Sequence, residues 1–244
     1  MKTLLAAFAL APLVAAAAEI PPPPPPTPPP LFSGKAELSF VSTSGNTSTQ
    51  TLGTAAEAEY KPAPWAYKAA FAFVRAESDE EVKARSLAFL LRAARKIADP
   101  IEVFGEARYL KNTFAGIENR FSADAGVAYT LIKAPQHLLK VEGALGYTRE
   151  LRVTPPDLSF ATARAGLSYK WSISKTSELT EDSNFIADLS DKNDWRYNNV
   201  CALSAAVSTL FSLKASYTFA YVRKPPPGFG RTDTITSAAI VAKF

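Results

Sequence analysis

The chain has 244 residues, of which 27 are Lys or Arg and 23 are Asp or Glu, with a formal net charge of +4. The charges are spread along the sequence and form no basic patch, which argues against a nucleic-acid partner. One cysteine, Cys201, excludes an internal disulfide, and with a single histidine it cannot build a structural zinc site. We therefore expect no metal and no cofactor.

The first 18 residues have the order of a cleavable secretory signal. Lys2 precedes an apolar stretch from Leu4 to Val14, and small residues follow before Glu19. Since the stretch is too short to span a bilayer, we expect residues 1–18 to be removed on export. Residues 19–33 are proline-rich. Prolines fix φ and lack an N–H, which predicts an extended periplasmic segment, either a tether or a docking element for a periplasmic partner.

From residue 34 to residue 244, apolar and polar residues alternate with period two, which is typical of strands with one apolar and one polar face. Turn signals such as Asp99-Pro100 and Ala134-Pro135 separate the runs. After the signal, no apolar run is long enough for a transmembrane helix. We predict an all-β fold, a single transmembrane antiparallel up-and-down β-barrel of about twelve strands.

A soluble β-sandwich would show the same alternation, but three features favour the barrel. Aromatic residues such as Trp65 and Trp195 lie near strand ends, as in the interfacial girdles of membrane barrels. The chain ends on Phe244, which resembles the C-terminal signal read by the outer-membrane assembly machinery. Charged residues recur on the polar face, and we predict that ten of them line the lumen: Glu57, Lys68, Arg92, Glu106, Arg108, Asp124, Lys140, Glu142, Arg164 and Lys170.

Several phrases also carry a family resemblance. They are Thr43-Ser44-Gly45-Asn46-Thr47, the segment 114–120 (FAGIENR), 126–129 (GVAY), 143–150 (GALGYTRE) and 169–174 (YKWSIS). In order and spacing they resemble the YdiY-like family of salt-induced outer-membrane proteins, whose members are uncharacterised. The resemblance covers residues 31–244. It implies an outer-membrane barrel with no established activity and no catalytic residues, in a Gram-negative envelope with lipid and lipopolysaccharide around it.

Isolated polar residues suggest chemistry only weakly. His137 lies in the 134–137 turn, on the expected periplasmic side, whereas a hydrolase of the outer-membrane phospholipase type needs its histidine near the outer leaflet. Asp188, Asp191 and Asp194 form a loose acidic group without the spacing of a calcium loop. Arg120 has two possible partners, a lipopolysaccharide phosphate or an inward carboxylate such as Glu118 or Asp124. We predict that the protein is not an enzyme.

Two functions remain open. Charges of both signs suit a narrow, weakly selective pore, but they also suit ion pairs that close the lumen, because a barrel of about twelve strands lies between filled and open barrels. The alternative is a non-conducting envelope protein that supports the membrane or binds a partner, with a link to osmotic or salt stress implied by the family's name.

Overall fold

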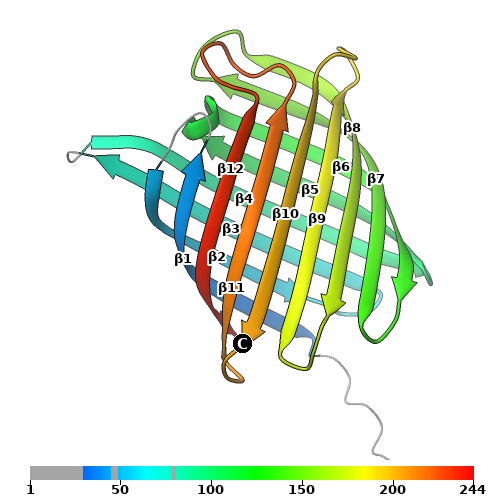
Figure 1. Cartoon of the computed structure of the whole chain (residues 1–244). Coiled ribbons are helices and arrows are strands. Elements are labelled where there is room, and N and C mark those ends of the chain that lie inside the picture. Colours follow the sequence, from blue (N-terminus) through cyan, green and yellow to red (C-terminus); the bar gives the residue numbers. More distant parts are fainter. Residues whose placement is uncertain (1–29, 45–48, 79–80) are drawn as a thin grey trace, which may run out of the picture.

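Within residues 30–44, 49–78 and 81–244, which the computed structural model describes, twelve antiparallel strands close into one barrel (Figure 1). Each strand pairs with its neighbours in sequence, and β1 pairs with β12. The predicted fold class and strand number are confirmed. The signal expected at 1–18, residues 19–29 of the proline-rich segment and the 45–48 turn lie outside the described residues.

The strands are long enough to cross a bilayer when tilted. The first strand begins at Phe32, two residues before the start of the barrel that the sequence predicts at residue 34. Their bounds are β1 Phe32–Ser44, β2 Thr49–Tyr60, β3 Trp65–Ser78, β4 Glu81–Ala98, β5 Ile101–Asn112, β6 Ile117–Lys133, β7 His137–Arg152, β8 Leu158–Ser172, β9 Ser177–Asp188, β10 Trp195–Ala206, β11 Phe211–Val222 and β12 Thr232–Lys243.

The two ends of the barrel differ in the length of their connections. The end that carries the C-terminus, here called the terminal end, has the short turns 61–64, 99–100, 134–136, 173–176 and 207–210. The opposite end, here called the loop end, includes the longer segments 153–157, 189–194 and 223–231. A one-turn 3-10 helix, η1 (Thr113–Ala115), lies at the loop end between β5 and β6. Among the described residues, no helix is long and apolar enough to cross a membrane.

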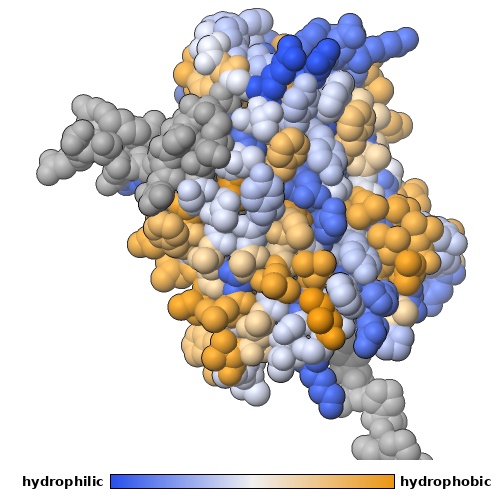
Figure 2. Space-filling view, in the orientation of Figure 1, coloured by the Kyte–Doolittle hydropathy of each residue, from blue (hydrophilic) through white to orange (hydrophobic). Residues whose placement is uncertain are grey.

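The faces of the strands are reversed relative to a soluble protein. Leu91 and Leu145 on the outer face are 62% and 66% exposed, whereas Thr162 and Arg164 inside are 1% and 5% exposed. Figure 2 shows apolar side chains gathered on the outer surface over the strands. Period-two alternation places one apolar residue outside for each inward one. An apolar exterior with a polar interior is the arrangement of a barrel that faces lipid.

Candidate functional site: the charged lumen

Six of the ten predicted lumen residues form one network on the inner wall of β4–β8. This central cluster consists of Arg92, Glu106, Arg108, Asp124, Glu142 and Arg164. Three guanidinium groups face three carboxylates, so its net charge is zero when all six are ionised. The cluster therefore adds no net charge to the middle of the lumen.

Arg92 and Arg164 hold the cluster together from β4 and β8. Arg92 donates from Nη1 to Glu106 Oε2 at 3.0 Å and from Nη2 to Glu142 Oε2 at 2.7 Å. Arg164 donates to Glu142 and to Asn184 Oδ1, the latter at 3.0 Å. The Arg92 guanidinium also lies 3.7 Å from the centre of the Phe104 ring, a cation–π contact. These contacts bridge carboxylates of two separate strands.

The remaining pair of the cluster joins β5 to β6. Arg108 donates to Asp124, and its Nε lies 3.3 Å from Glu106 Oε1. Asp124 Oδ1 also accepts a hydrogen bond from Thr162 Oγ1 at 3.2 Å. The carboxylate has room because its cross-strand neighbour is Gly146, where a Cβ would lie 2.3 Å from Asp124 Oδ1.

A glycine also makes room for an inward carboxylate between β7 and β8. Glu142 pairs with Gly166 on β8, where a Cβ would lie 2.6 Å from Glu142 Cγ. Both glycines are therefore needed for the close approach of a carboxylate to the barrel wall. Together they let two acidic side chains lie flat against the inner surface.

The other four predicted residues form smaller ion pairs towards the terminal end. Glu57 contacts Lys35 at 3.0 Å and Lys68 at 2.9 Å. Lys140 contacts Glu102 at 3.2 Å, and Lys170 contacts Glu178 at 2.6 Å. Each of the ten residues thus has an oppositely charged partner. For eight of them a partner belongs to the predicted set, whereas Lys140 and Lys170 pair with Glu102 and Glu178 outside it.

A cavity enters the barrel from the terminal end. Its volume is ≈ 920 Å³, and it runs from the 61–64 turn to the central cluster. The charged residues that line its outer part are Glu59, Lys61, Lys68, Lys96, Glu102, Lys140 and Asp182. These charged side chains make the cavity polar, and its volume is large enough for water and small ions.

A second network, which the sequence did not predict, fills the loop end. This loop-end cluster consists of Arg120, Glu150, Arg152, Asp194 and Arg196. Glu150, only 1% exposed, lies 2.5 Å from Arg120, 2.7 Å from Arg152 and 3.3 Å from Arg196. The guanidinium of Arg196 also lies 4.7 Å from the centre of the Phe160 ring. One carboxylate is therefore the shared counter-ion of three arginines.

A signal for this cluster was present in the sequence. Glu150 and Arg152 continue the inward alternation of Lys140 and Glu142 along β7, and Arg196 lies between the outward Trp195 and Tyr197. Arg120 contacts Glu150, so neither Glu118 nor Asp124 is its partner, and its side chain is turned inward, away from lipid.

The connecting segments at the loop end are tied to one another. Arg152 Nη2 donates to the carbonyl oxygen of Lys224 at 3.3 Å, and Lys224 forms an ion pair with Asp191. The Phe229 ring packs on Gly116, whose φ of +72° favours glycine and where a Cβ would lie 2.6 Å from the ring. These contacts draw η1, the 189–194 segment and the 223–231 segment together over the lumen.

Two acidic groups of the 189–194 segment have shifted pKa values. A hydrogen bond from Lys224 holds the pKa of the exposed Asp191 carboxyl below its usual range. Burial raises the pKa of Asp194, because a charged carboxylate loses hydration there, although Arg196 acts in the opposite direction.

The residues considered for other chemistry have structural partners. His137 begins β7, its Nδ1 is 2.8 Å from the Tyr169 hydroxyl, and its ring stacks on Tyr169 and Trp171. Asp188 accepts hydrogen bonds from the backbone N–H groups of Ser190 and Asp191, at 2.7 and 3.2 Å. Within the described ranges, no group of three or more His, Cys, Asp or Glu residues is arranged to hold a metal ion.

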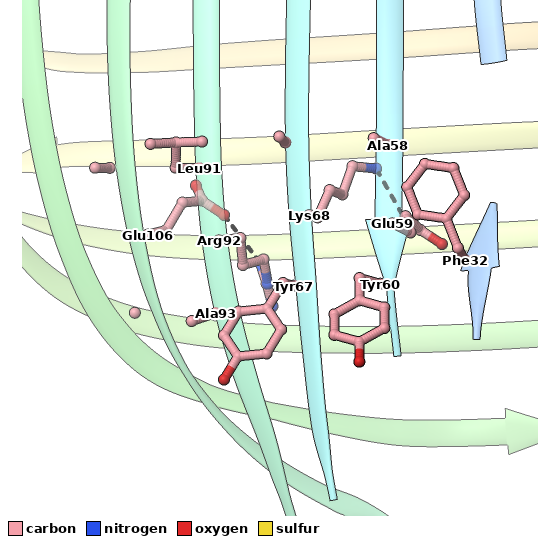
Figure 3. A pocket seen from close by; sticks show the side chains of 13 residues that line it. Phe32, Ala58, Glu59, Tyr60, Tyr67, Lys68, Leu91, Arg92, Ala93 and Glu106 are labelled. Carbon is pink, nitrogen blue, oxygen red and sulfur yellow. Dashed lines mark hydrogen bonds and ion pairs between the residues drawn. The ribbon is translucent and has the colours of Figure 1, made fainter. Parts of the chain in front are cut away.

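A shallow depression of ≈ 610 Å³ lies across β1–β5 and is lined by Tyr60, Tyr67 and small residues such as Ala58 and Ala93 (Figure 3). The charged residues shown there, which include Lys68 with Glu59 and Arg92 with Glu106, alternate with these small residues along the strands. Alternation assigns the small and aromatic lining residues to the lipid-facing side.

Phe244 closes the barrel. Its N–H donates to the Gly34 carbonyl oxygen at 2.9 Å, and its own carbonyl oxygen accepts from the Gly34 N–H at 2.7 Å. The ring covers Gly34, where a Cβ would lie 2.3 Å from Phe244 Cε2. The role of Phe244 as an assembly signal stays a prediction.

Comparisons with known proteins agree with this geometry. The barrel is similar to the NanC porin, with a TM-score of 0.59 and 9% identity over 86% of this chain and 100% of that one. It is also similar to the translocator domain of the autotransporter NalP from Neisseria meningitidis, with a TM-score of 0.54 and 12% identity over 89% and 90% of the two chains. At these identities the likeness shows the fold alone, that of an outer-membrane barrel.

Sequence comparison identifies the family. The uncharacterised protein YdiY of Escherichia coli strain K12 is 24% identical over 202 residues, which cover 80% of this chain and 76% of YdiY. Residues 36–244 match the family described as a protein of unknown function, DUF481. The match covers almost the whole barrel, and the chain therefore belongs to the DUF481 family of YdiY-like outer-membrane β-barrels.

Proposed function

We propose that the protein is a narrow, weakly selective outer-membrane channel whose lumen is closed at the loop end in the conformation described. The observation that carries the proposal is the cavity of ≈ 920 Å³ that enters from the terminal end. Outer-membrane barrels have short periplasmic turns and longer external loops. This pattern supports an orientation with the terminal end in the periplasm and the loop end at the cell surface.

The proposed selectivity follows from the balance of charges. An ion that enters the cavity meets Lys61, Lys96 and Lys140 together with Glu59 and Glu102, and then the neutral central cluster. Selectivity filters use rings of charge of a single sign. Mixed charges with mutual partners lower the barrier for both signs of ion, and so we expect little discrimination between anions and cations.

The proposed closure depends on Glu150. Its carboxylate neutralises part of the charge of Arg120, Arg152 and Arg196, and Arg152 in turn holds the carbonyl group of Lys224. If this carboxylate is removed, Arg120 and the buried Arg152 and Arg196 repel one another, and Asp194 remains as the described carboxylate in contact with Arg196. The segments that cover the lumen then lose a main anchor.

Planar-bilayer recording of the refolded full chain tests the proposal. We expect small, infrequent steps from the parent protein, with a reversal potential near zero in a salt gradient. Glu150→Gln is expected to give larger or more frequent steps. Glu102→Gln, which removes a single ion pair with Lys140 in the cavity, is the matched control and leaves the frequency of opening unchanged.

The second candidate is a non-conducting envelope protein that supports the membrane or binds a periplasmic partner through its proline-rich segment. One observation favours it, since Arg92 and Arg164 link carboxylates across several strands and stiffen the wall. The Glu150→Gln and Glu102→Gln proteins test this candidate. If both fold as barrels and neither shows current steps at any voltage, the non-conducting protein is favoured over the channel.

A further inference from the structure

Basic side chains lie on the outer face of the barrel near the loop end. Lys111 on β5 pairs across the sheet with Leu87, and Arg149 on β7 pairs with Phe121. Residues directly opposite in a sheet point to the same face. Because Phe121 is an exposed, outward residue, Arg149 shares the lipid-facing side with it. Arg85 on β4 is exposed at the same end, two residues from Leu87.

Lys111 and Arg149 differ from the inward arginines in their lack of a counter-ion within the described part of the chain. The arginines of both internal clusters contact carboxylates. By contrast, among the described residues neither the Lys111 nor the Arg149 side chain takes part in an ion pair or a side-chain hydrogen bond. Two acidic residues of this region, Glu118 and Asp157, are also exposed, but neither forms an ion pair with Lys111 or Arg149 in the described part of the chain.

An apolar surface lies next to these cations on the side away from the loops. Phe71, Phe89, Tyr109 and Phe121 form a continuous row of rings, with centroids 5.0, 6.3 and 4.9 Å apart. Tyr147 and Leu145 extend the surface below Arg149 and are 55% and 66% exposed. Tyr109 and Phe121 lie in the parts of β5 and β6 nearest the loop end, where aromatic side chains of membrane barrels mark the boundary between acyl chains and headgroups. Lys111, two residues beyond Tyr109, and Arg149, which pairs with Phe121, therefore lie at headgroup level.

We propose that Lys111 and Arg149, flanked by Arg85, bind the phosphate groups of lipopolysaccharide in the outer leaflet. A phosphate accepts paired hydrogen bonds from a guanidinium group, and the rings below accommodate acyl chains. The assignment uses the same orientation as the proposed channel, with the loop end at the cell surface. It does not depend on conduction, so the two proposals fail separately.

Native mass spectrometry of the full chain in detergent, titrated with short-chain lipopolysaccharide, tests the proposal. The double variant Lys111→Gln/Arg149→Gln is expected to bind the lipid at least ~10-fold more weakly, since each charged hydrogen bond lost contributes measurably to affinity. Arg95→Gln is the matched control: Arg95 is an exposed cation at the terminal end, 5.6 Å from the Trp65 ring, and its loss leaves binding unchanged.

Binding measurements with two other lipids separate the possible ligands. Enzymatically dephosphorylated lipopolysaccharide is expected to bind the parent protein as weakly as intact lipid binds the double variant. Equal binding of the two lipids, or of the two proteins, overturns the proposal, and so does equal affinity for phosphatidylglycerol, which would make the site one for any anionic lipid. If the double variant does not fold, Arg149→Lys keeps the charge but loses the paired geometry, and we expect an intermediate affinity.

Discussion

Arginine and lysine occupy different parts of the lumen because their head groups differ. Arg164 and Arg196 are 5% and 3% exposed, and each meets more than one polar partner. Lys170 has a side chain 45% exposed and a single carboxylate partner. A planar guanidinium with five donors bridges several acceptors and tolerates burial, whereas a lysine ammonium is more strongly hydrated. The arginines therefore join strands in the interior, and Lys170 lies in a more exposed position nearer the terminal end.

Two adjacent residues on β8 test the assignment of faces. Leu167 is 38% exposed and outward by alternation from the inward Arg164, whereas Ser168 is inward by the same alternation and its hydroxyl donates to Asp182 at 2.6 Å. An arginine facing lipid near the midplane costs about 2–4 kcal/mol. We expect Leu167→Arg to lower the free energy of unfolding in lipid vesicles by about that amount, measured by urea titration. Ser168→Arg gains Asp182 as a partner and should change it little, and a reversed order of the two would mean that the faces are misassigned.

At the scale of the element, the strands were predictable and the contacts between loops were not. Alternation along a strand depends only on local sequence, so the inward direction of Arg92 or Glu142 follows from its outward neighbours. Which carboxylate an inward arginine meets depends on register across several strands, which is fixed only when the barrel closes. For this reason the sequence suggests Glu118 or Asp124 as an internal partner of Arg120, whereas the structure pairs it with Glu150, 30 residues away.

The tether between the 189–194 and 223–231 segments predicts a response to pH. Lys224 lowers the pKa of Asp191 below its ordinary value of about 3.9. A carboxyl with a lowered pKa stabilises the folded loops fully above the ordinary value, and the effect is lost as pH falls through the lowered one. We expect hydrogen exchange of residues 223–231, corrected for intrinsic rates, to be constant between pH 7 and pH 5 and to increase only below about pH 4.

Two comparisons check that the carboxyl of Asp191 is responsible. Asp191→Asn should show faster exchange at neutral pH and no further step on acidification. Because the pair is exposed, salt screens it, and high ionic strength should reduce the difference between parent and variant. An increase in exchange between pH 7 and pH 5 would point to a group other than Asp191.

At the scale of the whole molecule, stability depends on closure, since an open sheet in lipid would leave two edges of unpaired backbone groups. β1 and β12 meet over ten register pairs, from Lys35 with Lys243 to Ser44 with Thr234. The hydrogen bonds between Gly34 and Phe244 extend this ladder at the terminal end. The last residue of the chain therefore contributes to the seam that makes the barrel continuous.

Removing Phe244 is expected to lower the fraction of assembled barrel, measured in cells as heat-modifiable mobility at equal expression. Deleting residues 21–30 should leave that fraction nearly unchanged, because prolines cannot donate to the strand ladder. Phe244→Ala keeps both backbone bonds to Gly34 and removes only the ring, so it separates the two roles of the residue. If the ring serves as an assembly signal, this variant refolds normally into lipid vesicles but assembles poorly in cells. Equal loss in both settings would make the ring a packing element, and normal assembly in cells without Phe244 would remove either role.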